Sequence, residues 1–212
     1  MTTSEDVDDR ARAAAIDAGV RAEAVTIGWM ILEAAAAIGA GMIAHSVLLT
    51  AFGADSVIEL LSGGVLLWRL RSEGRHANVE AVERRAGWIS AALLALLCVY
   101  VLVFVVLGLL RHVEPESSPI GIAVSSAAIV VMPLLARWKR QINVTLRSAA
   151  LRADIAETTA CAYMAVCVVL GLVLNIVMGW WWIEYVATLV LLIWLIHETK
   201  EALDGAHGGE FR

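Results

Sequence analysis

Charged residues, prolines and paired cysteines are all scarce in this sequence. Only 17% of its 212 residues are charged, whereas 60% are hydrophobic and the mean hydropathy is +0.76. An average soluble domain has about 25% charged residues. The 3 cysteines lie inside apolar runs without a CxxC pair, which argues against a disulfide framework. The basic residues form no patch of the kind that binds nucleic acid, and we expect no nucleic-acid partner.

The hydrophobic residues are instead concentrated in six long runs, at about residues 24–44, 47–70, 86–110, 119–136, 151–178 and 180–196. A helix needs about 20 apolar residues to cross a hydrocarbon core of about 30 Å. The runs therefore predict an all-α integral membrane protein. We expect a six-transmembrane-helix bundle in residues 23–198, between an N-terminal tail (1–22) and a short C-terminal tail (199–212).

The basic residues indicate an orientation. Two of the predicted loops are rich in them: Arg69, Arg71, Arg75, Arg84 and Arg85 in one, and Arg137, Lys139, Arg140, Arg147 and Arg152 in the other. Both loops fall on one side of the membrane, and the opposite side has only Arg111 besides histidine. The positive-inside rule then places both loops and both termini in the cytoplasm. We expect a multi-pass protein of the cell (plasma) membrane, specifically a prokaryotic inner membrane.

Acidic residues inside the apolar runs are the strongest functional signal. Glu33 lies in the first run, Asp55 and Glu59 in the second, and Asp154 and Glu157 in the fifth. A charged side chain at the bilayer centre costs about 2.5–3.5 kcal/mol on insertion scales. Such residues usually face the bundle interior and mark ion or proton pathways.

Two pairs of side chains share helix faces. Asp55 and Glu59 are four residues apart, so both project from one side of their helix. Glu157 and Cys161 repeat this spacing on the fifth run, and Asp154 lies on the same face. Three carboxylates and one thiol would suit a tetrahedral divalent cation, with zinc and manganese both open. Because each group can also hold a proton, metal and protons would compete for one site, which is the physical basis of antiport.

Each of these residues also fits a structural role. The Asp55–Glu59 pair could link helices, and Glu157 could lie close enough to the cytosol to be solvated. Cys161 fits a small packing residue about as well as a ligand. Asp154 fits an interfacial partner of a nearby arginine better than a ligand. Three residues outside the pairs are candidates for an accessory or proton-coupling role: Glu33, Asp154 and His76. A structural role suits Glu33 equally well, and His76, in a basic loop, is more often merely solvated.

A weak internal repeat relates the two pairs. SVLLTAFGADSVIE (46–59) aligns without gaps on SAALRADIAETTAC (148–161), which matches Asp55 with Glu157 and Glu59 with Cys161. The second and fifth runs would cross the membrane in opposite directions, so the pattern predicts an inverted 3+3 pseudo-repeat. Transporters often bind their substrate where such repeats meet.

These segments resemble the cation diffusion facilitator (cation efflux) family. The resemblance rests on AGMIAHSVLLTAFGADSVIELLSGGVLLWRLR (40–71) and on SAALRADIAETTACAYMAVCVVLGLVLNIVMGWWWIEYVATLVLLI (148–193). It implies a six-helix metal–proton antiporter whose ligands are Asp55, Glu59, Glu157 and Cys161. In family members, each pair usually consists of one Asp or His and a second Asp. This chain has an Asp–Glu and a Glu–Cys pair instead, so the resemblance does not specify which metal is bound. The chain would be a short form without the family's cytosolic domain, and a homodimer would form through the membrane helices.

We therefore expect a non-enzymatic secondary transporter that exports a divalent transition metal (Zn, Mn, Fe, Co or Cd) in exchange for protons, without a required cofactor. Two alternatives stay open. One is a proton-coupled exporter of small organic cations, which would need an aromatic-lined pocket around one key acid. The other is a membrane metal sensor or partner subunit that binds metal without moving it. An enzyme is least expected, because the sequence has no HExxH motif.

Overall fold

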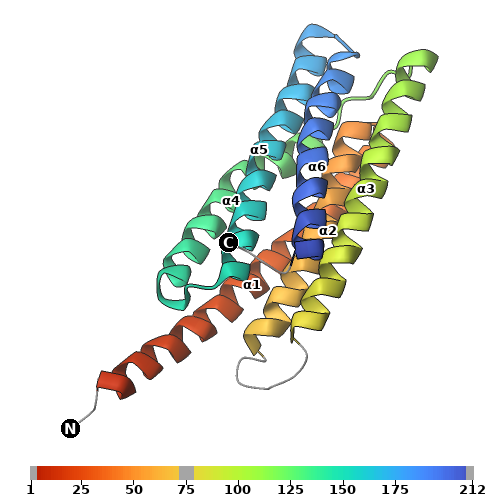
Figure 1. Ribbon diagram of the computed structural model, residues 1–212. Coiled ribbons are helices and arrows are strands. Elements are labelled where there is room, and N and C mark those ends of the chain that lie inside the picture. Colours follow the sequence, from red (N-terminus) through yellow and green to blue (C-terminus); the bar gives the residue numbers. More distant parts are fainter. Residues whose placement is uncertain (1–3, 72–78, 209–212) are drawn as a thin grey trace.

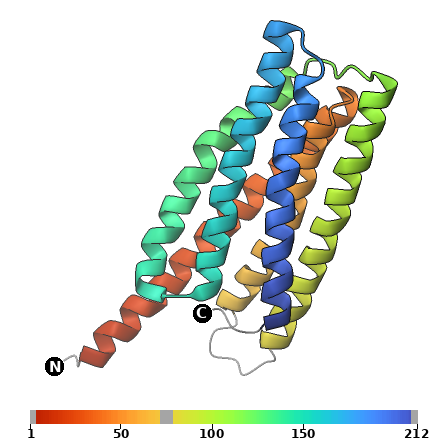
Figure 2. The same ribbon diagram turned by 45° about the horizontal axis from the view of Figure 1, so that its top comes forward.

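The computed structural model describes residues 4–71 and 79–208, and within them the chain forms six helices. These are α1 (Ser4–Ile43), α2 (Val47–Arg71), α3 (Val79–Arg111), α4 (Pro119–Leu146), α5 (Ala149–Met178) and α6 (Ile183–Gly208). They form one elongated bundle in which successive helices alternate in direction (Figures 1 and 2). Each predicted apolar run coincides largely with a helix, although residues 180–182 of the sixth run precede α6, and the all-α prediction is confirmed.

The outer faces of the bundle are apolar. In the described part of the chain, helices α1 to α5 each contain a segment long and apolar enough to cross a membrane. On α3, large side chains such as Leu96, Leu102, Phe104 and Leu110 are exposed. Soluble monomers rarely expose apolar patches of that extent. The bundle therefore fits a multi-pass membrane protein whose outer side chains contact lipid.

α6 differs from the other five helices in the length of its apolar stretch. Its apolar stretch, Tyr185 to Ile196, is flanked by Glu184 and His197, and it covers roughly 18 Å at the rise of an α-helix. This is shorter than a hydrocarbon core of about 30 Å. Gly179 takes a left-handed conformation (φ 64°) that ends α5, and α6 starts at Ile183, after a turn at residues 181–182.

α1 is much longer than its predicted span. The region expected as a tail is helical from Ser4, so that α1 has 40 residues and extends beyond the other helices at the end where the chain begins (Figure 1). Residues 10–14, on this extension, are exposed. Helix propensity does not follow hydropathy, since Glu and Arg form helices about as readily as Leu, and acidic residues are favourable in the first turns of a helix. Hydropathy alone therefore did not locate the start of α1.

Small residues bring α1 and α2 close together. A Cβ atom at Gly53 of α2 would lie 2.9 Å from the Cβ of Ala37 and 2.8 Å from the backbone nitrogen of Ile38 on α1. Ten residues further along α2, nearly three helical turns, a Cβ at Gly63 would collide with the carboxyl group of Glu23. Close backbone approach through small residues is how helices pack in membranes, where lipid is as apolar as a leucine side chain.

Serine residues begin three of the helices. Ser46 Oγ accepts a hydrogen bond from the backbone N–H of Leu49 (3.2 Å), and Ser148 Oγ accepts one from Leu151 (3.3 Å). Ser118 caps α4 in the same way, through Gly121. Each serine satisfies one of the backbone donors that a helix start leaves unpaired. The 46–59 and 148–161 segments therefore begin with the same local structure.

Candidate functional site

Glu33 of α1 lies at the centre of a buried polar cluster. Its Oε2 accepts a hydrogen bond from the Trp29 indole N–H (2.6 Å), and its Oε1 accepts one from the Ser56 hydroxyl of α2 (2.7 Å). The Cys161 thiol of α5 also donates to Oε1, at 3.6 Å. Three donors thus face one fully buried carboxyl group, which meets the hydrogen-bonding requirement of a buried acid. Glu33 thereby joins three helices.

Asp55 and Glu59 of α2 belong to the same cluster. Both side chains are buried, and Cys161 is completely so. The carboxyl groups of Glu59, Glu33 and Asp55 all lie close enough to the Cys161 thiol to interact with it electrostatically. α2 and α5 also pack directly against each other. The structure therefore brings together three of the four predicted ligands, with Glu33, which the sequence suggested only as an accessory residue, between them.

Glu157, the fourth predicted ligand, is less enclosed. It lies one helical turn before Cys161 on α5 and is half-buried. Across residues 4–71 and 79–208, no group of three or more His, Cys, Asp or Glu side chains is gathered tightly enough to hold a metal ion. The cluster is therefore a set of neighbouring acids and a thiol, not a closed coordination shell. His76, another accessory candidate, lies outside the described residues.

A second buried cluster ties α1, α4 and α5 together. Lys139 Nζ lies 2.9 Å from Glu23 Oε2 of α1 and 2.6 Å from Asp154 Oδ2 of α5, where it also donates a hydrogen bond. The Lys139 side chain is 0% exposed and that of Glu23 1% exposed. The sequence predicted Lys139 as a loop residue and Asp154 as a partner of a nearby arginine; the partner is instead this buried lysine. If all three are ionised, one cation is shared by two carboxylates.

A third cluster lies at the opposite end of the bundle. Glu184, in the first turn of α6, accepts hydrogen bonds from the Ser46 hydroxyl (2.7 Å) and from the Asn175 side chain of α5 (3.0 Å). Asn175 also donates to the Pro115 carbonyl, in the connection between α3 and α4. The cluster joins the start of α2, the end of α5 and the start of α6.

Sequence reasoning missed Glu23, Lys139 and Glu184 as buried residues. Glu23 and Lys139 lie just outside apolar runs, where hydropathy places the membrane interface, and Glu184 lies near the start of the sixth run. A signal was present for Glu23, which falls ten residues before Glu33 and next to the start of the first predicted span. Nothing in the sequence distinguished Lys139 from its exposed neighbours Arg137 and Arg140. Its partners come from distant segments of the chain.

The arrangement has two properties relevant to chemistry. The central cluster holds carboxyl groups and a thiol, which can exchange protons or bind a cation. Clusters of polar residues lie on either side of it along the bundle. In comparisons with known proteins, no family model matches the chain and no curated protein is significantly similar to it.

Proposed function

We propose that the chain is a six-span secondary transporter that exchanges a divalent transition-metal ion for protons, as the resemblance to cation diffusion facilitators implies. The observation that carries the proposal is the central cluster. Glu33, Asp55, Glu59 and Cys161 are buried together in a bundle whose outer surface is apolar. Ionisable residues at such positions are costly and typically mark ion pathways.

The hydrogen bond between Cys161 and Glu33 suggests how protons are coupled to the metal. A thiol binds metal as a thiolate, so a metal that reaches Cys161 must displace its proton. The Glu33 carboxyl group, to which the thiol already donates, is placed to accept that proton. Asp55 and Glu59 would turn toward the metal and supply oxygen ligands. Reprotonation of the thiol and carboxyl groups on the other side of the membrane would release the metal.

The two outer clusters suggest how access alternates. Lys139 with Glu23 and Asp154 would close one end of the bundle, and Glu184 with Ser46 and Asn175 the other. α5 contributes to both: Cys161 lies roughly 10 Å along the helix from Asp154 and roughly 21 Å from Asn175. Opening either cluster would connect the central cluster to one side. Metal and protons shift this balance only by binding the two states differently.

Helix packing supports an inverted repeat. α1 packs on α2 as α4 packs on α5, and α2 packs on α3 as α5 packs on α6. α1 with α4, α2 with α5 and α3 with α6 also pack directly. Exchange of the two halves would preserve all of these pairings, whereas the smaller contact between α2 and α6 has no comparable counterpart between α3 and α5 in the described residues. α2 and α5 run in opposite directions (Figure 2). With α6 as a sixth span, the arginine-rich end and both termini would face the cytoplasm.

One observation favours a second candidate, a proton-coupled exporter of small organic cations. Such a protein needs an aromatic group beside a key acid, and Trp29 bonds directly to Glu33. Aromatic faces attract organic cations. We favour the metal, because three carboxyl groups lie within electrostatic range of a thiol, and a thiol is a metal ligand but not a receptor for organic cations.

The test is flux in proteoliposomes loaded with a pH-sensitive dye. Zinc, manganese, iron, cobalt and cadmium are screened one at a time, together with an organic cation such as ethidium. We expect proton movement with at least one metal, abolished by Asp55→Asn and retained by Glu201→Gln, which makes the same chemical change at an exposed position. Proton movement with the organic cation alone would select the second candidate. Tight metal binding without flux would instead indicate a sensor or partner subunit.

A further inference from the structure

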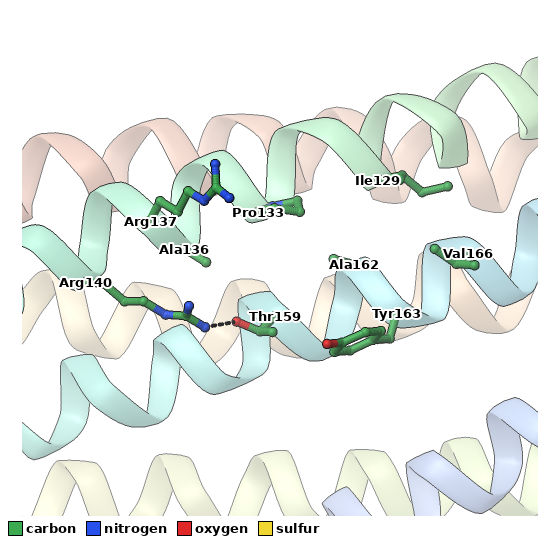
Figure 3. Close-up of a pocket in the computed structure, with 9 residues that line it drawn as sticks. All are labelled: Ile129, Pro133, Ala136, Arg137, Arg140, Thr159, Ala162, Tyr163 and Val166. Atoms are coloured by element: carbon green, nitrogen blue, oxygen red, sulfur yellow. Dashed lines mark hydrogen bonds between the residues drawn. The ribbon is translucent and has the colours of Figure 1, made fainter.

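A pocket between α4 and α5 faces the outside of the bundle (Figure 3). Its volume is about 330 Å³. Pro133, Arg137, Arg140, Tyr163 and Val166 line it and are all exposed, so the pocket opens outward and away from the central cluster. We call it the α4–α5 groove. None of the three buried clusters contributes a lining residue.

We propose that the α4–α5 groove binds an anionic phospholipid, with the lipid phosphate on Arg137 and Arg140 and an acyl chain along the apolar part of the groove. The proposal depends on the bundle lying in a membrane and not on what it transports. It is carried by three observations: the distribution of charge along the groove, its depth in the bilayer and the way Arg140 is held.

Charge and apolar surface are separated along the groove. Arg137 and Arg140 lie toward one end, and Ile129, Ala162 and Val166 toward the other (Figure 3). A phospholipid has the same division, with a phosphate above an acyl chain. Guanidinium groups suit phosphate oxygens because they offer parallel N–H donors. Basic pockets between transmembrane helices are recurrent sites for anionic headgroups.

The depth of the two arginines matches the headgroup region. α4 begins at Pro119, after a polar connection. At 1.5 Å per residue, Arg137 and Arg140 lie roughly 27 Å and 32 Å along the helix from that point. A hydrocarbon core is about 30 Å thick, so with Pro119 at one interface the arginines reach the other. From Arg140 to Ile129 the groove then runs roughly 16 Å into the bilayer, about the depth of one leaflet.

Arg140 is held in position for a ligand. Its Nη2 donates to the Thr159 hydroxyl oxygen (3.2 Å), and that hydroxyl donates in turn to the Ile155 carbonyl (2.7 Å). The arginine thus reaches from α4 across to α5, and the Tyr163 hydroxyl lies on the same side, one turn further along (Figure 3). One contact uses one of the five N–H donors of a guanidinium, which leaves the others for phosphate oxygens.

The experiment is a lipid titration of the purified full chain in detergent, followed by native mass spectrometry. Phosphatidylglycerol and phosphatidylcholine with identical acyl chains are compared, and inorganic phosphate is tested alone. We expect tighter binding of phosphatidylglycerol. In the double variant Arg137→Gln/Arg140→Gln its apparent Kd should rise about fivefold for each arginine, or about thirtyfold for both.

A matched control removes the same charge at the same end of the bundle. Arg147→Gln/Arg152→Gln changes two exposed arginines that do not line the groove, and it should keep the lipid preference. Ala162→Phe fills the apolar part and should weaken both lipids. Equal binding of the two lipids, equal loss in both double variants, or binding of inorganic phosphate as tight as that of the lipid would each overturn the proposal.

Discussion

At the scale of single residues, Lys139 is the most consequential side chain outside the central cluster. It is fully buried between Glu23 and Asp154. Breaking a buried ion pair by removing one partner is strongly destabilising, because a charge is left uncompensated. Here one substitution would leave two carboxyl groups facing each other. Replacing all charged members with apolar groups is a different case, often neutral or stabilising.

We therefore predict that Lys139→Met lowers the free energy of unfolding by about 3–5 kcal/mol. Unfolding in a sodium dodecyl sulfate titration, followed by circular dichroism, measures this. Lys200→Met, at an exposed position of α6, is the matched control and should change stability by less than about 0.5 kcal/mol. Adding Glu23→Leu and Asp154→Leu should restore most of the loss. If Lys139→Met unfolds like the control, the buried ion pairs do not hold the three helices together.

The central cluster shows what residue patterns can and cannot predict. The spacing of Asp55 and Glu59 on one helix face, and of Cys161 on another, follows from helical periodicity, and the structure places these three side chains together. The sequence predicts Glu33 as an acid inside the membrane, but it does not predict that Glu33 bonds to Ser56 of α2 and Cys161 of α5. Which residue of one helix contacts another depends on helix rotation and register, and one sequence does not specify these.

At the scale of helices, the two segments of the internal repeat begin alike but are not equivalent. Ser46 and Ser148 each accept a hydrogen bond from the backbone N–H three residues later. Only Ser46 also donates its hydroxyl proton to the buried Glu184. The sequence alignment matched the two serines correctly, but the second role of Ser46 involves α6, which lies outside the repeat segments.

We predict that Ser148→Ala costs about 1 kcal/mol, the usual value of a helix cap. Ser46→Ala should cost about 2–3 kcal/mol, because it also leaves one oxygen of a buried carboxyl group without its donor. Both are measured by the same detergent titration, with the exposed Ser117→Ala as control. Equal losses for Ser46→Ala and Ser148→Ala would mean that the bond to Glu184 contributes nothing to stability.

The limits of hydropathy appear at the helix ends. It located all six helices, but it began the first about twenty residues late, because the residues of Ser4 to Arg21 are helical without being apolar. Hydropathy also predicted that Lys139 lies in a loop, whereas α4 continues to Leu146. Helix propensity and buried ion pairs decide these boundaries, and both act independently of mean hydropathy.

At the scale of the whole molecule, the number of membrane crossings depends on α6. α1 to α5 have spanning segments in the residues that the structure describes, whereas the apolar part of α6 covers roughly 18 Å. A short span is accommodated by local thinning of the bilayer or by interfacial side chains. Trp180 and Trp182 stack at the start of α6, and tryptophan favours the interface. We therefore expect α6 to cross with the connection between α5 and α6 at the outer interface.

Single cysteine substitutions at exposed positions test this arrangement with a membrane-impermeant maleimide. The positions are Ser117 between α3 and α4, Thr145 near the end of α4 and Glu201 near the end of α6. Ser117→Cys should react in intact cells, because the positive-inside rule places its connection outside. Thr145→Cys and Glu201→Cys should react only after permeabilisation. The parent chain, whose three cysteines lie on α3 and α5, sets the background.

Each deviation has a distinct structural meaning. Reaction of Glu201→Cys in intact cells, with the other two as expected, would show that α6 does not cross the membrane and that the protein has five spans. An inverted 3+3 repeat would then be impossible, because its second half would lack a third crossing. Reaction of Thr145→Cys before permeabilisation, with Ser117→Cys protected, would invert the orientation. In that case the Lys139 cluster would close the outer end of the bundle, and any metal released through it would leave the cell by that route.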